Sequence, residues 1–321
     1  MRNIRPQRHQ GHIEKMMMHS EKPSLETQEL QEKAKLGSFN TQRAYAADWK
    51  LFENYCQNQG YESLPASAVV VANYLSSCKK YAWHTLQRKL AAIWKQHSLA
   101  GYTENPCQHR MVLQVLEGWK REKGIDQKQA PAFSMAFFKQ TLAEFPESYA
   151  GLRDKTILLL GLAGAFRRSE LVALNIEDIQ MDSDFVVLRI RQSKTNQYQE
   201  KEYKLLAYSA DIRFCPVRNL QAWLQVLGNK QGALFVSINK ADILSEQRIC
   251  DKTVYLLTKK HLGTQFSAHS LRASFVTIAK LNGADDQAIM NQTGHKTISM
   301  IRKYTRIQSL KDFNAVTKLG L

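Results

Sequence analysis

Five polar residues in the second half of the chain have the types needed to attack a phosphodiester. They are Arg167, His269, Arg272, His295 and Tyr304. Guanidinium groups can neutralise a phosphate, imidazoles can exchange protons and hydrogen bonds, and a phenol can act as a nucleophile. His269 and Arg272 are three residues apart, so on a helix they share one face and can reach the same phosphate. Because a phenol has an ordinary pKa of about 10, Tyr304 needs neighbouring cations that favour its phenolate.

The order and spacing of these residues form recognisable motifs. Arg167 ends an apolar run and opens the sequence Arg-Arg-Ser-Glu-Leu, while His269 opens the motif His-Ser-Leu-Arg. His295 follows a glycine, and Tyr304 follows His295 by nine residues. Together these motifs resemble the tyrosine recombinase (phage integrase) family over roughly residues 38–321.

The resemblance implies an enzyme, a site-specific DNA recombinase that cleaves and rejoins DNA through a 3′-phosphotyrosyl intermediate, with no cofactor, metal ion or ATP. It implies that Tyr304 is the nucleophile and that Arg167 and Arg272 clamp the phosphate. His269 would accept or donate a proton near the tyrosine, and His295 would hydrogen-bond or pack at the phosphate. In the sequence itself, no carboxylate cluster suited to Mg²⁺ and no glycine-rich phosphate loop accompanies these residues.

Two further positions are expected to support the reaction. Lys194 stands in Ser-Lys-Thr on a proposed hairpin turn, and in the family a lysine there enters the minor groove and donates a proton to the leaving 5′ oxygen. Lys201 and Lys204 are nearby competitors for that role. Glu170 would orient a residue of the site from behind the phosphate, and Thr293 stands where many relatives have an apolar residue.

The charge of the chain also favours a nucleic-acid partner. Its 321 residues suffice for two domains, and 45 Lys and Arg outnumber 29 Asp and Glu to give a net charge of +16. A surplus of that size favours a polyanion, and double-stranded DNA is the first candidate. A soluble protein with a basic surface is the alternative explanation of the charge alone.

Cysteine usage and hydropathy favour an intracellular protein. The five cysteines are far apart and form no zinc-binding pattern, so free thiols in a reducing compartment are the simplest account. The longest apolar stretch is too short to span a bilayer, and the N-terminus lacks the apolar core of a secretory signal. We therefore expect a cytoplasmic, nucleoid-associated protein with no membrane partner.

The pattern along the chain predicts a tail, two domains and a linker. Residues 1–37 are polar and are expected to be a flexible tail, and residues 38–123 carry helical periodicity. Charged and helix-breaking residues at 124–131 predict a linker, and residues 132–321 mix helical and strand patterns. We expect a mainly α protein, with an N-terminal four-helix core-binding (SAM-like) domain and an α+β catalytic domain with a small antiparallel sheet.

Four amphipathic helices are expected in the N-terminal domain. Apolar residues at steps of three and four predict helices from about residue 40 to Gly60, from Ser67 to Cys78, from His84 to Leu99 and around Val112 to Trp119. The third helix carries Arg88, Lys89 and Lys95, which we expect to contact DNA. A solvated charged face is the alternative for these residues.

The catalytic domain is expected to be mostly helical. Strands are predicted at 185–190 and 202–206, joined by a polar turn, and at 233–236. The predicted helices are 134–144, 152–163, 168–174, 216–227, 245–261, 270–282, 285–292, 298–304 and 308–318. The last one carries an apolar stripe that could dock on a neighbouring protomer or on its own domain, formed by Leu310, Phe313, Val316 and Leu319.

The resemblance also implies an assembly. Strand exchange needs four active sites, so a homo-tetramer on two recombination sites is expected. Two other functions stay open at this point. A type IB topoisomerase uses the same residue types but relaxes supercoils as a monomer, and a non-catalytic DNA-binding protein would keep the basic surface without using Tyr304.

Overall fold

The computed structural model describes residues 24–26, 39–126, 129–191, 202–228, 231–298 and 300–301. The chain forms two compact units, Met1–Asp126 and Gln127–Leu321, and the division falls inside the stretch expected to be a linker. Lys194, Tyr304 and the helix expected at 308–318 lie outside the described residues. Among the described residues, no helix is both long and apolar enough to cross a membrane.

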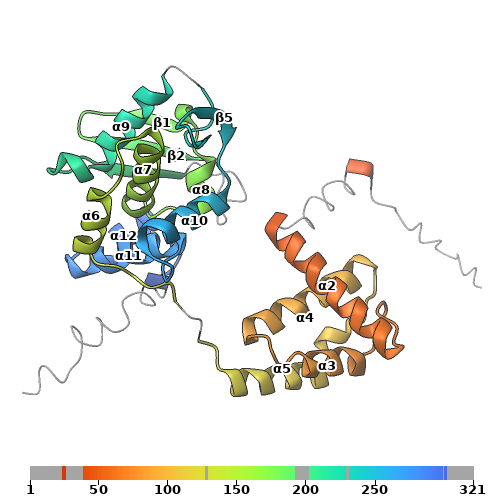
Figure 1. Ribbon diagram of the computed structural model, residues 1–321. Coiled ribbons are helices and arrows are strands. Elements are labelled where there is room, and N and C mark those ends of the chain that lie inside the picture. The colour runs from red at the N-terminus through yellow and green to blue at the C-terminus, as the bar shows by residue number, and fades with distance from the viewer. Residues whose placement is uncertain are drawn as a thin grey trace, which may run out of the picture. The chain divides into compact units, whose positions relative to one another are not determined.

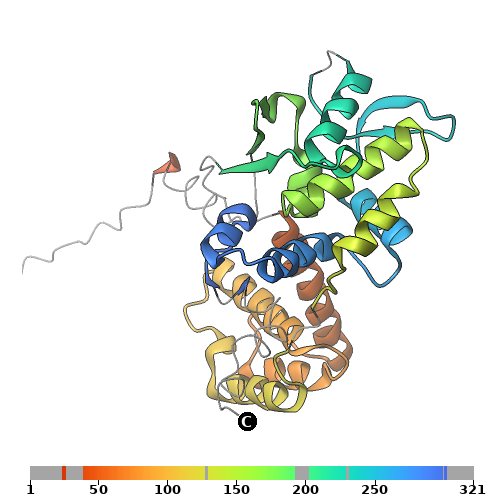
Figure 2. The same cartoon turned by 90° about the vertical axis from the view of Figure 1, so that its left-hand side faces the viewer.

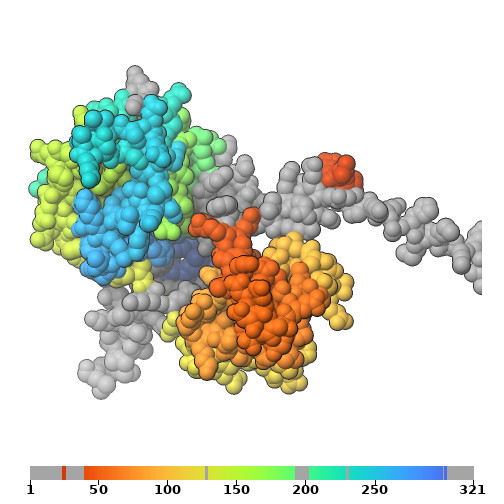
Figure 3. All heavy atoms as spheres, turned by 45° about the vertical axis from the view of Figure 1, so that its right-hand side comes forward, coloured from red at the N-terminus to blue at the C-terminus, as the bar shows by residue number. Residues whose placement is uncertain are grey.

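Residues 39–126 of the N-terminal unit contain the four predicted α-helices (Figures 1 and 2), with similar bounds: α2 (Phe39–Gln59), α3 (Ala68–Ser77), α4 (Trp83–Leu99) and α5 (Arg110–Lys123). Ser67 caps α3, since its hydroxyl oxygen accepts from the Val70 backbone N–H at 3.3 Å. In Figure 3, α2 lies on the face of this unit that is turned toward the viewer. The core contains fully buried apolar residues from all four helices, among them Phe52, Val71, Leu75, Leu86, Ile93 and Val112.

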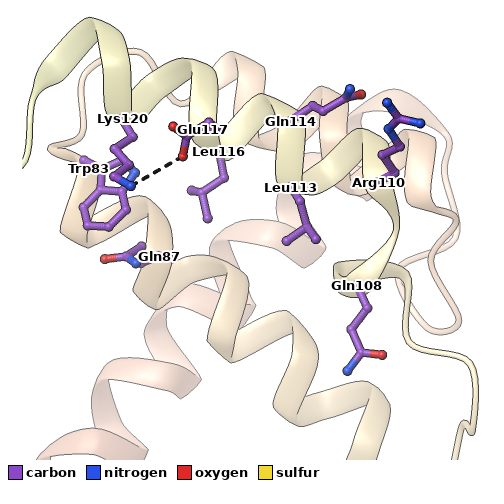
Figure 4. A pocket seen from close by; sticks show the side chains of 9 residues that line it. All are labelled: Trp83, Gln87, Gln108, Arg110, Leu113, Gln114, Leu116, Glu117 and Lys120. Atoms are coloured by element: carbon purple, nitrogen blue, oxygen red, sulfur yellow. Dashed lines mark ion pairs between the residues drawn. The ribbon is translucent and has the colours of Figure 1, made fainter.

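An open groove of about 640 Å³ runs along the surface of this unit (Figure 4). Side chains of α4 and α5 line most of it, and Lys120 pairs with Glu117 at 3.6 Å while its ammonium lies 5.8 Å from the centre of the Trp83 ring. Of the residues expected to contact DNA, Arg88, Lys89 and Lys95, none lines the groove.

The C-terminal unit is mostly helical and is organised around α7 (Figures 1 and 2). Most residues of α7 (Tyr149–Ala163) are buried, so it forms the centre of the core. Within its described residues, the other α-helices are α6 (Met135–Ala143), α8 (Arg168–Ala173), α9 (Pro216–Leu227), α10 (Asp251–Leu262), α11 (Ala268–Leu281) and α12 (Asp286–Thr293). The mainly α fold with a small antiparallel sheet is therefore confirmed.

A three-stranded antiparallel sheet lies beside these helices, with the order β1 (Ile179–Met181), β2 (Phe185–Ile190) and β3 (Glu202–Ala207). The sequence predicted β2 and β3 but not β1, which is too short to show a periodic pattern. Side chains on β2 and β3 alternate between solvent and core, and Val186, Leu188, Ile190 and Leu206 face the core. Lys204 shares that inward face and is 2% exposed.

The structure contradicts the helix predicted at 245–261. Leu244–Arg248 forms strand β5 instead, paired antiparallel with β4 (Val236–Ile238), and the helix begins only at Asp251. Glu246 and Gln247 favour helices intrinsically, but tertiary contacts decide the outcome. The Arg248 guanidinium donates to the backbone oxygens of Val172 and Leu174 at 2.5 and 2.8 Å, which fixes the strand beside α8. The short strand predicted at 233–236 is correspondingly displaced, and Ala233 forms only an isolated bridge with Asn175.

Helices α7 and α11 approach each other closely at Gly161. A Cβ atom at this position would lie 2.8 Å from Leu271 Cδ1, which is shorter than ordinary van der Waals contact. Leu271 is 1% exposed and is held in the core, so it cannot move aside easily. The glycine therefore lets α11 lie against α7, and α11 carries both His269 and Arg272.

Candidate active site

Arg167 is presented by the short turn between α7 and α8. It is the N-terminal cap of α8, and its side chain is 19% exposed. Glu170 holds it twice: Oε2 accepts from the Arg167 backbone N–H at 3.0 Å, and Oε1 accepts from the guanidinium at 2.5 Å. Since the Glu170 side chain is fully buried, it can orient Arg167 from behind without reaching a substrate itself.

Arg272 reaches the same turn from α11. It is 2% exposed, and its Nη1 donates to the Ala165 backbone oxygen at 2.8 Å. Ala165 has a φ of 45°, a left-handed conformation that few residues with a Cβ adopt. The two arginines therefore meet at one turn, although they are far apart in sequence. The sequence predicted that these two arginines clamp one phosphate, and that role stays a prediction.

His269 lies in the first turn of α11, on the exposed side of the site. Partial desolvation by the surrounding protein lowers its pKa, and the positive charges of Arg272 and Arg167 lower it further. The ring is therefore neutral at physiological pH, and a neutral imidazole can accept a proton from a nearby hydroxyl.

His295 follows the end of α12 and is 6% exposed. Gly294 caps this helix in the left-handed region, with a φ of 64°, and so turns the chain toward the arginines. Burial lowers the pKa of His295 to about 4, with further contributions from Arg272, Arg167, His269 and Lys204. His295 is thus a neutral hydrogen-bonding group at neutral pH.

Thr293 determines which nitrogen of His295 carries the proton. Its hydroxyl donates to the Ile289 backbone oxygen at 2.7 Å, and its oxygen lies 3.0 Å from His295 Nδ1. Because the single hydroxyl hydrogen is already committed, the Thr293 oxygen accepts from an Nδ1–H group. Neutral His295 then has its basic lone pair on Nε2. The hydroxyl of Thr293 therefore has a direct structural role beside His295.

Lys204 was considered from sequence as a competitor of Lys194, and the structure places it next to the arginines. Burial lowers the pKa of Lys204 to about 8, Arg272 and Arg167 act in the same direction, and Glu170 and Glu202 act against it. The sequence pattern alone did not show that Lys204 is buried. Strand residues two apart share a face, so Leu206 lies on the face of Lys204, but the apolar Tyr203 and Leu205 lie on the other face.

The structure thus brings together Arg167, Glu170, His269, Arg272 and His295, and adds Lys204 and Thr293. Two guanidinium groups and two neutral imidazoles can bind a phosphate by charge and hydrogen bonds. The expected nucleophile Tyr304 and the expected proton donor Lys194 lie outside the described residues.

The expectation that Lys89 contacts DNA is wrong in this structure. Lys89 is 1% exposed, and its ammonium donates to Asp48 Oδ1 and to the Tyr74 hydroxyl, both at 3.2 Å. On a helix it lies on the same side as the buried Leu86 and Ile93, so it points into the core. Arg88 also pairs with Asp48, at 2.7 Å, but its side chain is 47% exposed. Lys95 is partly exposed and lies seven residues from Arg88, on the same face of α4.

Comparison with known proteins identifies relatives that match most of the chain. Residues 136–310 match the phage integrase family. An integrase/recombinase xerD homolog from Selenomonas ruminantium is 33% identical over 310 residues, which cover 94% of this chain and 90% of the relative. The tyrosine recombinase XerA of Pyrococcus horikoshii is 26% identical over 224 residues, covering 66% of this chain and 73% of XerA.

Solved structures share the fold at low sequence identity. A lambda integrase dimer bound to a COC′ core site matches with a TM-score of 0.58 at 13% identity, over 87% of this chain and 93% of that one. The Tn1549 transposon integrase in complex with transposon right end DNA matches with a TM-score of 0.57 at 12% identity, over 89% of this chain and 97% of that one. Since the family match spans more than half of the chain and its Selenomonas relative matches along most of both lengths, the chain belongs to the phage integrase family, the tyrosine recombinases, which cleave and rejoin DNA.

Proposed function

We propose that the site cleaves one strand of duplex DNA by direct attack of Tyr304 on a phosphodiester. The tyrosine oxygen forms a bond to phosphorus, the bond from phosphorus to the 5′ oxygen breaks, and a 3′-phosphotyrosyl link results. His269 takes the phenolic proton, and Lys194 gives a proton to the departing 5′ oxygen. Attack by a 5′ hydroxyl from a partner strand reverses these changes and restores the phosphodiester.

The observation that carries this proposal is the convergence of Arg167 and Arg272 on the turn at Ala165. Arg272 is anchored there by its 2.8 Å hydrogen bond, and Arg167 is held two residues later by Glu170. Planar guanidinium groups fixed in this way suit the two non-bridging oxygens of a phosphate, whose charge grows in the transition state. Because the phosphotyrosine retains the energy of the original bond, rejoining requires neither ATP nor a metal ion.

DNA binding is proposed to use both units. In the N-terminal unit, Arg88 and Lys95 share a face of α4 that is at least partly exposed to solvent, and the whole chain has a net charge of +16. Solved relatives with this fold are bound to DNA. We expect binding to weaken steeply with salt because phosphate contacts release counterions. A salt-independent affinity between about 50 and 200 mM would argue against this basic surface.

The assembly is proposed to be a homo-tetramer on two recombination sites, working in the cytoplasm in association with the nucleoid. Strand exchange between two duplexes needs four cleavages, and one protomer supplies one tyrosine. Sedimentation of the complex with target DNA under conditions that trap cleaved strands tests this number directly.

A nicked substrate that loses a short fragment after cleavage tests the chemistry. We expect wild-type protein to form a denaturation-resistant covalent complex on its target site, and Tyr304→Phe to form none while still binding DNA. Absence of the complex with wild type on that site would favour a DNA-binding protein without catalysis. Relaxation of supercoiled DNA by a monomer, without recombinant product, would favour a topoisomerase.

A further inference from the structure

Lys204 breaks the pattern of the strand that carries it. The inward positions of β2 and β3 are apolar except for Lys204 and the half-buried Glu202 at the start of β3, and Lys204 pairs across the strands with the buried Leu188. Burying an ammonium group is unfavourable compared with burying an apolar side chain of similar size. A residue that breaks the local rule in this way, within a site of charged groups, is expected to serve function rather than stability.

The contacts of Lys204 connect three segments of the site. Its Nζ donates to the Gln292 backbone oxygen at 2.5 Å and lies 5.2 Å from the centre of the Phe166 ring. The Gln292 side chain in turn donates to the backbone oxygens of Ala163 and Leu205, both at 2.8 Å. Strand β3, the α7–α8 turn and the end of α12 are thereby fixed to one another.

We propose that Lys204 is a positioning residue for DNA cleavage, which holds the end of α12, and with it His295, against the turn that presents Arg167. This inference rests on the function proposed above. Lys204 is buried and bound to a carbonyl, so it acts through these neighbours and not on the DNA. Its role therefore differs from that of Lys194, the proposed proton donor.

The charges around Lys204 give this role a measurable consequence. Glu170 on α8 and Glu202 on β3 favour its ammonium form, while Arg167 and Arg272 disfavour it. With a pKa of about 8, Lys204 is mostly charged at pH 7, and that charge helps to lower the pKa of His295. Replacing it by a neutral residue removes a nearby positive charge, so the pKa of His295 should rise.

The test compares Lys204→Met, which keeps the length without the charge, with Lys204→Arg, which keeps the charge. Leu206→Met is the matched control, because Leu206 lies two residues away on the same buried face. We expect Lys204→Met to form the covalent complex about 10- to 100-fold more slowly, Lys204→Arg to recover part of the rate, and Leu206→Met to stay within about threefold of wild type.

A substrate with sulfur in place of the bridging 5′ oxygen separates positioning from proton donation, since a thiolate leaves without a general acid. We expect sulfur to rescue Lys194→Ala and not Lys204→Met. Rescue of Lys204→Met would make Lys204 itself the proton donor and overturn the inference. A wild-type rate for Lys204→Met on both substrates would also overturn it.

Titration of the His295 ring by NMR supplies a readout that does not depend on catalysis. If wild-type protein forms no covalent complex, the proposed function fails, but an increase in the His295 pKa in folded Lys204→Met still supports the placement of Lys204. Thermal melting confirms that each variant folds. If Lys204→Met does not fold, Lys204→Gln takes its place, and an unchanged His295 pKa in the neutral variant contradicts the inference.

Discussion

Lys89 in the N-terminal unit and Lys204 in the C-terminal unit are both buried, but their surroundings differ. Lys89 donates to a carboxylate, Asp48, and to the Tyr74 hydroxyl, and the nearby Arg88 binds the same carboxylate. Lys204 donates to a backbone carbonyl and lies near Arg167 and Arg272. A buried cation that donates to a buried carboxylate forms a structural ion pair, whereas three cations near one turn, with Glu170 and Glu202 as the carboxylates beside them, are arranged to bind a further negative charge.

The largest expected effect tests whether the C-terminal cations serve chemistry. Arg272→Lys keeps the charge but loses the planar fork of donors, so the rate of covalent complex formation should fall by about 10²- to 10³-fold. The rate is measured in a single turnover at saturating protein, and the melting temperature should change little. A cleavage rate within about threefold of wild type would show that the cations around Lys204, like those around Lys89, have a structural role only.

Substitutions among Asp48, Arg88 and Lys89 in the N-terminal unit should have the opposite effect: they should lower stability and leave the cleavage chemistry intact. Asp48→Ala leaves Lys89 buried without its carboxylate and should lower the free energy of unfolding by about 3 kcal/mol. Lys89→Met should cost less than about 1 kcal/mol, because an apolar side chain of similar size replaces the charge. Tryptophan fluorescence during urea unfolding reports mainly on this unit, which holds four of the five tryptophans, Trp49, Trp83, Trp94 and Trp119. If Asp48→Ala and Lys89→Met lower the free energy of unfolding equally, the ion pair with Asp48 does not explain why Lys89 can be buried.

His295 should make the stability of the C-terminal unit depend on pH. Its pKa is about 4 in the folded protein, below the ordinary value of about 6.5 in the unfolded chain. The unfolded state therefore binds a proton first as the pH falls, so stability is fully present above about pH 6.5 and is lost progressively toward pH 4, by up to about 3 kcal/mol. His295→Gln should flatten this part of the stability profile, as measured by denaturant unfolding from pH 4 to 7. An unchanged slope would mean that His295 is not buried as a neutral ring.

The smallest effect concerns Thr293. Thr293→Val removes the acceptor for His295 Nδ1–H at almost constant volume, so both tautomers of the ring become accessible. We expect the cleavage rate to fall by about tenfold and the ¹⁵N shifts of His295 to move toward a tautomer mixture. Thr293→Ser retains the hydroxyl and should behave like wild type. If Thr293→Val keeps the wild-type ¹⁵N shifts, another group fixes the tautomer.

The helices of both units could largely be predicted because apolar residues recur at helical spacing along them. The same helical spacing also indicates that Lys89 is buried, because Leu86 and Ile93 lie on its side of α4. Strand β5 could not be predicted, because its polar residues acquire their conformation only from pairing with β4 and from the contacts of Arg248. Local sequence does not contain such long-range pairing.

The motifs predicted several residues that the structure brings together at the site, but not the backbone contacts that hold them there. His-Ser-Leu-Arg places His269 and Arg272 on one helix face, and a sequence pattern can show this. The Ala165 carbonyl that anchors Arg272 is a backbone group, and no side-chain pattern marks it. The same holds for the Gln292 carbonyl that binds Lys204, since backbone partners depend on the path of the chain rather than on residue type.

Gly161 allows close packing of two helices that lead to the site. Its lack of a Cβ determines how near α11 can come to α7, and α11 carries Arg272 while α7 leads into the turn that carries Arg167. A larger residue at 161 would require Leu271 to shift, and Leu271 is the neighbour of Arg272 on α11. A single methyl group at this buried position would therefore disturb the part of α11 from which Arg272 reaches the turn.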